Sequence, residues 1–381
     1  MSRFRKFSLV PTIIIVSAFL LPGFGLRAQA RELEQLLVVQ TMGLDRSAEG
    51  LRLSLASKGG SEADSAPVRL AGSGPSAAAA RERIRAGVSD EDLFCAHISH
   101  LLIGEETAAQ GIGPLLDELC RSRDLRLSLP VYILRGGDAA EAVLGVGDEK
   151  TGVCDALASV DSDLSARGDG RTTPAAELLR DLARFDSALV CAVALQPSAE
   201  SDESPEAPER PRTLVPAGYA VLRGGALCGF LDRELAVGVG FLTGDTGACE
   251  ITVTDQAGLP LTLSLRGGRC DLTPQFDENG RLCGLELHAE AEAVLAEGAA
   301  GNTEESYLRM MLERELSGRI LQVLRLSQEW KADFLGLQGK LERAAPGRRG
   351  ALRRDLAALW PTLPLTVSVS ATMSGGEEGA P

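Results

Sequence analysis

The chain has 381 residues, a length typical of two or three domains. Hydrophobic residues make up 44% of it and its mean hydropathy is +0.04, values that are typical of a globular protein and exclude a disordered chain. Its formal net charge is -14 and its pI is about 4.9. This charge argues against nucleic acid as a partner, because phosphate backbones need a broad positive surface, and it predicts repulsion from an anionic membrane surface.

The first thirty residues have the parts of a secretory signal peptide: a basic start, an apolar run at 7–24 and a cleavage site. Ala28 and Ala30 supply the small residues of an A-x-A site, so we predict a signal peptide at 1–30 that is cleaved after Ala30. The alternative is an uncleaved anchor helix. Two prolines interrupt the apolar run, however, and it is short for a membrane span of about 20 residues.

Helix and strand patterns interleave along the next part of the chain, which predicts an N-terminal α+β domain at 31–196. Apolar runs predict strands at 36–45, 51–55, 101–103, 127–134 and 189–195. Apolar spacing and alanine content predict helices at 75–85, 105–110, 113–119 and 174–185. The segment at 59–74 is expected to be a loop, and the segment at 147–173 to be mobile.

Proline, serine and acidic residues fill the stretch at 197–212, and such a composition cannot bury enough apolar surface to order itself. We therefore predict an acidic, proline-rich linker there, or a long exposed loop. Strand patterns separated by glycine pairs follow, with a hairpin signal at 277–280. They predict a small β-rich domain at 213–285.

The longest regular pattern lies in the C-terminal α+β domain predicted at 286–375. Apolar residues recur at three- and four-residue steps over 316–334, which predicts a long amphipathic helix. A second helix is expected at 350–360, alternation at 365–372 predicts an edge strand, and 376–381 is expected to be a disordered tail. The expected fold class is multi-domain α+β, in which mixed sheets pack with helices.

Eight cysteines are present, and no two have the C-x-x-C spacing of common zinc sites. We expect mostly buried thiols, with Cys270 and Cys283 as the first pair to test for a disulfide. His97 and His100 resemble part of a metal cluster, but in a strand they would point to opposite faces. We therefore expect structural roles for them, and predict no metal site and no cofactor.

The sequence argues against an enzyme by the motifs it lacks. The segment at 145–151 resembles a phosphate loop but has glutamate where close backbone approach needs glycine. No G-x-S-x-G motif occurs. Two carboxylate pairs, Glu105 with Glu106 and Asp232 with Glu234, are possible acid/base pairs, but the preference of helix N-termini for acidic residues explains the first.

Six segments resemble, in the same order, motifs of one known family. They are REL to MGLD at 31–45, HISHLLIGEETA at 97–108, GIGPLL at 111–116, GFLD at 229–232, EWKADFLGL at 329–337, and WPTLP with the alternating strand at 360–372. The family is Ger(x)C, the C subunits of nutrient germinant receptors in endospore-forming bacteria. The number and order of the motifs carry the resemblance, which covers nearly all of the chain after residue 30.

The chain departs from the usual start of this family. Family members are usually lipoproteins, in which a cysteine directly after the signal segment receives the lipid. Here Ala30 is followed by Arg31, and the first cysteine is Cys95. We therefore expect ordinary signal peptidase to release the protein, or membrane attachment only through partner subunits or a residual signal anchor.

The resemblance implies a non-enzymatic, exported subunit at the outer face of the spore inner membrane. It would contact the membrane-embedded A and B subunits of a germinant receptor and couple nutrient sensing to germination. His97, Glu105, Trp330 and Asp333 are the candidate partner contacts, with core packing as the alternative. The alternative function is an exported ligand-binding or envelope-interaction module, and a secreted hydrolase ranks third.

Overall fold

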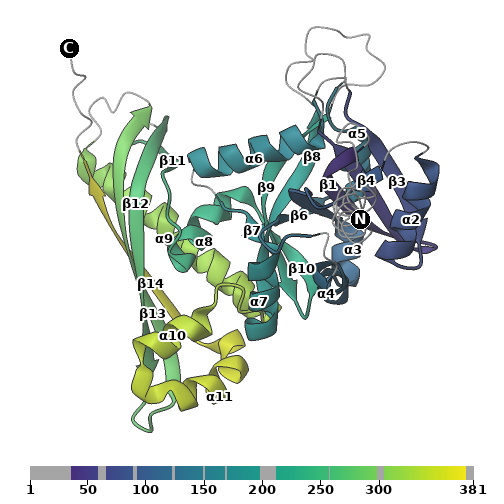
Figure 1. The fold of residues 1–381 in the computed structure, drawn as a ribbon. Coiled ribbons are helices and arrows are strands. Elements are labelled where there is room, and N and C mark those ends of the chain that lie inside the picture. Colours follow the sequence, from purple (N-terminus) through teal and green to yellow (C-terminus); the bar gives the residue numbers. More distant parts are fainter. Residues whose placement is uncertain are drawn as a thin grey trace, which may run out of the picture.

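The computed structural model describes residues 36–58, 66–88, 92–121, 125–148, 151–167, 170–197, 212–256, 258–297 and 304–374. The predicted signal peptide with Ala28 and Ala30, nearly all of the predicted linker, and the predicted tail lie outside these residues. The described chain forms two mixed sheets, each packed with helices, which confirms the predicted α+β class (Figure 1).

The first sheet has ten strands, in the main order β10-β9-β8-β6-β5-β1-β2-β3, with β4 beside β1 and β7 beside β6. Strands β1, β5, β6 and β8 are parallel neighbours, and the outer strands are antiparallel. The strands are β1 (Leu36–Ser47), β2 (Gly50–Ser57), β3 (Arg69–Gly74), β4 (Asp92–Phe94), β5 (His100–Gly104), β6 (Pro130–Arg135), β7 (Thr173–Pro174), β8 (Ser187–Pro197), β9 (Arg212–Arg223) and β10 (Ala226–Leu231).

Helices cover both faces of the first sheet. Ile84, Leu116 and Leu178 join one core on one face, whereas Val143 and Leu157 join a separate core on the other. The helices of the first face are α2 (Ala77–Gly87), α3 (Glu105–Gln110), α4 (Gly113–Arg121) and α7 (Ala175–Phe185), and those of the second are α5 (Ala139–Gly145) and α6 (Val153–Arg167). The sheet is therefore the middle of three layers.

The second sheet has four strands in the order β11-β12-β13-β14, so β14 lies at an edge as predicted. They are β11 (Cys249–Thr254), β12 (Pro260–Phe276), β13 (Leu282–Glu297) and β14 (Leu365–Met373). Leu285 and Leu287 of β13 are buried, while Glu286 and His288 between and after them are exposed. This alternation gives the sheet one face that packs on helices and one that meets water.

The helical elements of this half are η3 (Arg233–Leu235), α8 (Ala236–Thr243), α9 (Glu305–Trp330), α10 (Leu337–Ala344), η4 (Pro346–Arg348), α11 (Arg349–Leu359) and η5 (Trp360–Thr362). The predicted amphipathic helix is α9, which buries Leu308, Leu312, Leu316, Ile320, Val323, Leu324 and Ser327. Its 26 residues extend about 39 Å. No helix in the described ranges, α9 included, combines the length and the apolar character needed to cross a membrane.

Residues 213–285, predicted as a small β-rich domain, contribute strands to both sheets. Strands β8 and β9 pair as far as Pro197 and Arg212, so the predicted linker connects two adjacent strands of one sheet. One hydrophobic core also includes Leu189 and Val221 of the first sheet together with residues of the second half such as Ile320. The division of the chain into domains stays a prediction.

Two local predictions are wrong, and the first pair to test for a disulfide is not bridged. The segment at 147–173 contains helix α6, because Val153, Leu157, Val160 and Leu164 recur at helical spacing, a signal that nearby glycine and aspartate residues obscured. The segment at 59–74 ends in strand β3, which pairs with β2. Cys270 lies opposite Ala289 and is a free thiol, so it forms no hairpin bridge with Cys283.

Candidate functional site

Strands β1, β5 and β6 end at the same edge of the first sheet, because they are parallel and in register. Leu44 pairs with Ile103, and Gly104 pairs with Leu134, so the residues that follow these strands lie close together. Ligands of open α/β sheets bind at such carboxyl ends of strands. We define the carboxyl-edge cluster as Asp45, Glu105, Arg135, Phe230 and Asp232.

Asp45 is the buried anchor of this cluster and is only 2% exposed. Its Oδ1 accepts a hydrogen bond from the backbone N of Ala139, and its Oδ2 accepts one from the backbone N of Ala140, both at 2.7 Å. These two groups begin α5, where a carboxylate satisfies unpaired N–H groups. Burial raises the pKa of Asp45, although the two hydrogen bonds act in the opposite direction.

Gly104 and Glu105 join strand β5 to this anchor. A side chain at Gly104 would place its Cβ 2.2 Å from Oδ1 of Asp45, so this position requires glycine. The Oε2 of Glu105 accepts a hydrogen bond from the backbone N of Gly136 at 2.6 Å, directly after β6. The segment at 104–105 therefore lies against Asp45 of β1 and is hydrogen-bonded to the residue that follows β6.

Arg135 and Asp232 form the solvent-facing part of the carboxyl-edge cluster. The Nη1 of Arg135 lies 2.7 Å from Oδ1 of Asp232, and the two side chains are 40% and 70% exposed. The guanidinium of Arg135 also lies over the ring of Phe230, 5.0 Å from its centroid. An exposed ion pair contributes little to folding, about 0–1 kcal/mol, so these groups can exchange partners with another protein.

Trp330 lies at the junction of the two halves of the molecule. A Cβ at Gly229 of β10 would be 2.7 Å from Cζ2 of Trp330, so the indole packs directly on the first-sheet backbone. Arg223 of β9 donates a hydrogen bond to the carbonyl oxygen of Trp330 at 3.3 Å. The GFLD and EWKADF segments, about a hundred residues apart, thus meet in space.

Asp333 lies before helix α10 (Leu337–Ala344) and caps its first residues. Its Oδ1 accepts a hydrogen bond from the backbone N of Leu337 at 2.7 Å, and its Oδ2 accepts one from the backbone N of Gln338 at 2.9 Å. Burial raises the pKa of Asp333 to about 6, despite the lowering effect of these hydrogen bonds. Its contacts are those of a capping residue, and its role as a partner contact stays a prediction.

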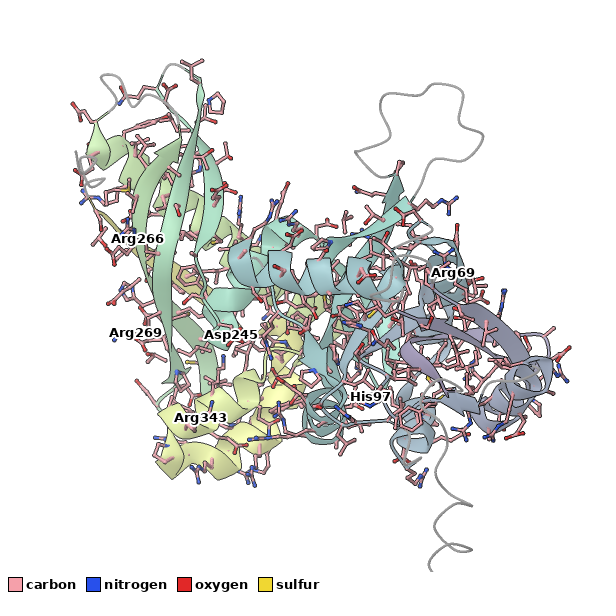
Figure 2. The ribbon with its side chains drawn as sticks, turned by 45° about the horizontal axis from the view of Figure 1, so that its top comes forward. Arg69, His97, Asp245, Arg266, Arg269 and Arg343 are labelled. Atoms are coloured by element: carbon pink, nitrogen blue, oxygen red, sulfur yellow. The ribbon has the colours of Figure 1, made fainter. Side chains whose placement is uncertain are left out.

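His97 and His100 occupy different environments. His97 is exposed in the turn before β5, with its ring 5.5 Å from that of Phe94, and Figure 2 shows it on the half that holds the first sheet. His100 is buried beneath α6, and its Nε2 lies 3.8 Å from Oδ2 of Asp161. The two histidines therefore share no site.

The buried His100 belongs to a polar cluster that the sequence did not reveal. Its Nδ1 is 3.9 Å from the sulfur of Cys154, which donates to Oε1 of Gln40 at 3.1 Å, and Tyr132 donates to Asp161. Cys154 and Asp161 lie on α6, in the segment that was expected to be mobile. Their spacing of seven residues, two helical turns, would have placed them on one face had the helix been predicted.

The four candidate contacts do not form one site. His97 precedes β5 and Glu105 follows it, so the strand separates them, while Trp330 ends α9 and Asp333 lies between α9 and α10. Of the four, the structure brings Glu105 into the carboxyl-edge cluster, together with Asp232, which the sequence pairs with Glu234 as a possible acid/base pair. Arg135 was missed, because a single arginine after a strand carries no pattern. No three or more His, Cys, Asp or Glu side chains within the described ranges could hold a metal ion.

Two family models match the chain in succession. Residues 29–151 match the spore germination protein N-terminal domain, and residues 217–375 match the spore germination B3/GerAC-like C-terminal domain. The chain belongs to the GerAC-like family of spore germination proteins. The first match contains Asp45, Glu105 and Arg135, and the second contains Phe230 and Asp232, so the carboxyl-edge cluster of this GerAC-like protein draws on both.

A solved structure described as the crystal structure of the GerBC protein has the same fold. The similarity covers 87% of this chain and 96% of that chain, with a TM-score of 0.56 and 15% sequence identity. At this identity the match concerns the fold of the GerAC-like chain and not its contacts. No curated protein sequence matches the chain.

Proposed function

We propose that the protein is a non-enzymatic subunit of a spore germinant receptor. It couples nutrient sensing to germination through contacts with membrane-embedded A and B subunits. The observation that carries this proposal is the pair of spore germination family models, which together match both halves of the chain. The mechanism requires binding surfaces and no catalytic groups.

The carboxyl-edge cluster is the contact surface that we assign to a partner subunit. Asp45 and Glu105 fix the backbone of this edge through hydrogen bonds, so Arg135 and Asp232 are held on a rigid support. A preorganised ion pair beside the Phe230 ring presents both charges and an aromatic face to a partner. Charged groups of this kind set the orientation and choice of partner.

We further propose that the protein is exported and acts at the outer face of the spore inner membrane. The signal peptide with Ala28 and Ala30 remains a prediction from the sequence. Because no cysteine follows Ala30 directly, retention at the membrane would depend on the partner subunits or on an uncleaved signal segment.

Nutrient-triggered release of dipicolinic acid tests the proposed role. Spores that lack the gene should lose the response to one nutrient while other triggers still act, and the wild-type gene should restore it. A strain with the double exchange R135D/D232R, which keeps an ion pair but reverses its charges, should respond at least about tenfold more slowly, because like charges would then face the partner.

The matched control is the double exchange D117R/R121D in α4, another exposed ion pair with its atoms 2.5 Å apart. This control should respond normally. A normal response from R135D/D232R would mean that the pair serves the fold alone, and an unchanged response of the deletion strain to every nutrient would contradict the receptor role.

A groove of about 1000 Å³ favours one other candidate, an exported ligand-binding module. Arg167 of α6, Arg233 of η3 and Arg319 of α9 line it together with Thr252 of β11. Glu234 and Glu250 also line it, so such a groove suits a polar ligand that carries both donors and acceptors. This candidate becomes the leading function if deletion of the gene leaves every germination response intact.

A further inference from the structure

Helices α10 and α11, with the turn η4 between them, carry a positive charge that contrasts with the rest of this acidic chain. Residues 337–359 contain six Lys and Arg residues and two acidic residues, whereas the whole chain has a net charge of -14. We call this part of the chain the basic helix pair. Figure 1 shows it at one end of the second sheet, beside the turn between β12 and β13.

Two of the six cations serve the fold. Lys340 donates to the carbonyl oxygen of Leu242 in α8. Arg353 donates two hydrogen bonds to the carboxylate of Glu342, at 2.9 and 3.0 Å, and this pairing lowers the pKa of Glu342 to about 2. Glu342 and Arg353 therefore neutralise each other, and four arginines remain.

The remaining arginines are exposed and use few of their donors within the protein. Arg343 and Arg354 have no hydrogen bond or ion pair to any residue that the structure describes. Arg349 uses its Nε to reach the carbonyl oxygen of Glu342 at 3.2 Å. Arg348 donates to the carbonyl oxygen of Gly280 at 3.0 Å and lies over a phenylalanine ring, so its side chain is held in place at the turn.

The carboxylates near the basic helix pair do not cancel these four charges. Asp355 is half-buried in α11, and Asp277 and Glu278 lie in the turn between β12 and β13. These three carboxylates are outnumbered by the four arginines together with Lys340. A positive excess therefore remains at this end of the molecule.

The position of the basic helix pair lets it act apart from the acidic remainder of the chain. Strand β12 has 17 residues and spans about 55 Å, so its far end lies several screening lengths away, since one is about 8 Å at physiological ionic strength. In Figure 2, Arg343 lies on the helices, while Arg266 and Arg269 lie farther along the second sheet. Net charge thus does not decide what this end binds.

We propose that the basic helix pair binds the surface of an anionic phospholipid membrane. Guanidinium groups match phosphate oxygens, and α10, η4 and α11 each contribute at least one exposed arginine. None of the large hydrophobic side chains exposed on the described surface belongs to these helices, so the contact is peripheral and electrostatic. This inference goes beyond the proposed receptor role and does not rest on it.

Co-sedimentation with lipid vesicles tests the proposal. The full chain should bind vesicles of equal parts phosphatidylglycerol and phosphatidylcholine more tightly than pure phosphatidylcholine vesicles, and added salt should remove this difference. The double variant R343Q/R354Q should bind about 25-fold more weakly, since each arginine near an anionic surface contributes about fivefold. Any contribution of the apolar run at 7–24 is common to all variants and cancels in their ratio.

The control R266Q/R309Q removes the same charge from exposed arginines elsewhere on this half, and it should bind like the wild type. Equal thermal midpoints would show that both double variants fold. Failure of the wild type to bind anionic vesicles would overturn the proposal, as would an equal loss in the control. Inorganic phosphate should release the protein no more than sodium chloride does at the same ionic strength. If phosphate releases it specifically, the site binds a soluble anion and the proposal is overturned.

Discussion

His100 shares its buried position with a thiol, a carboxylate and a phenol. Burial by itself would lower the pKa of His100, but the hydrogen bond to Asp161 and the contact with Cys154 raise it to about 9, above its ordinary value of 6.5. Burial, followed by the hydrogen bond to Asp161, raises the pKa of Tyr132, so the phenol stays neutral. The protonated imidazole therefore ties β5 to α6 at neutral pH.

This environment predicts how stability depends on pH. Because the pKa of His100 is higher in the folded protein than in the unfolded chain, its stabilising effect is complete below about pH 6.5 and is lost as the pH rises through about 9. The effect is at most about 3 kcal/mol. In H100Q, the fall in the free energy of unfolding between these pH values should largely disappear, as measured by denaturant titration.

The exposed His288 of the second sheet provides the control for this experiment. H288Q should keep the pH dependence of the wild type. If H100Q keeps it as well, the titrating group lies elsewhere, and the His100–Asp161 contact does not hold a proton in solution.

Among the helices and strands, periodicity was a reliable guide where the pattern was long. Helix α9, the hairpin of β1 and β2, and edge strand β14 were predicted from spacing alone. Helix α6 was missed although its apolar residues recur at helical steps, because acidic and small residues fill the other positions and suggested an unstructured segment. The polar composition of this segment therefore led to a wrong prediction, although its apolar periodicity correctly indicated a helix.

The sequence allowed the individual segments of the candidate site to be predicted, but not their arrangement in space. The segments that contain Asp45, Glu105 and Asp232 were recognised, but their meeting at one edge depends on the parallel order of β1, β5 and β6, which no local pattern encodes. Trp330 shows the same limit, since periodicity placed it on α9 but not against Gly229. Topology brings these residues together, and a single sequence does not specify it.

Helix α6 yields a test of its own packing. L157A removes a fully buried side chain from the core between α6 and the first sheet, so it should lower the free energy of unfolding by about 2–5 kcal/mol. S159A, on the exposed side of the same helix, should change it by less than about 0.5 kcal/mol. Equal, small effects of both variants would mean that this segment is not packed on the sheet.

Across the whole molecule, the two sheets share one hydrophobic core, and Trp330 of the second half packs on the backbone of the first. The halves should therefore unfold together. Both tryptophans, Trp330 and Trp360, lie in the C-terminal half, so their fluorescence reports on that half while circular dichroism reports on the entire chain. In the wild type, the two signals should follow a single transition.

Gly229→Ala should disturb this coupling, because its Cβ would meet the Trp330 ring at 2.7 Å. We expect a loss of about 1–3 kcal/mol and a fluorescence transition that separates from the circular dichroism transition. Gly113→Ala makes the same chemical change in open space and should leave the transitions together. Coincident transitions in Gly229→Ala would argue that the junction contributes little to cooperativity.

The pairing of β8 with β9 has a practical consequence. Pro197 and Arg212 are paired across the two strands, so the chain leaves and re-enters the sheet at one place. The entropic cost of closing such a connection rises slowly with its length, by about 0.6 kcal/mol for each doubling. The stretch between these residues is therefore the natural position for a fluorescent reporter, with which the protein could be followed in living spores while both termini stay unaltered.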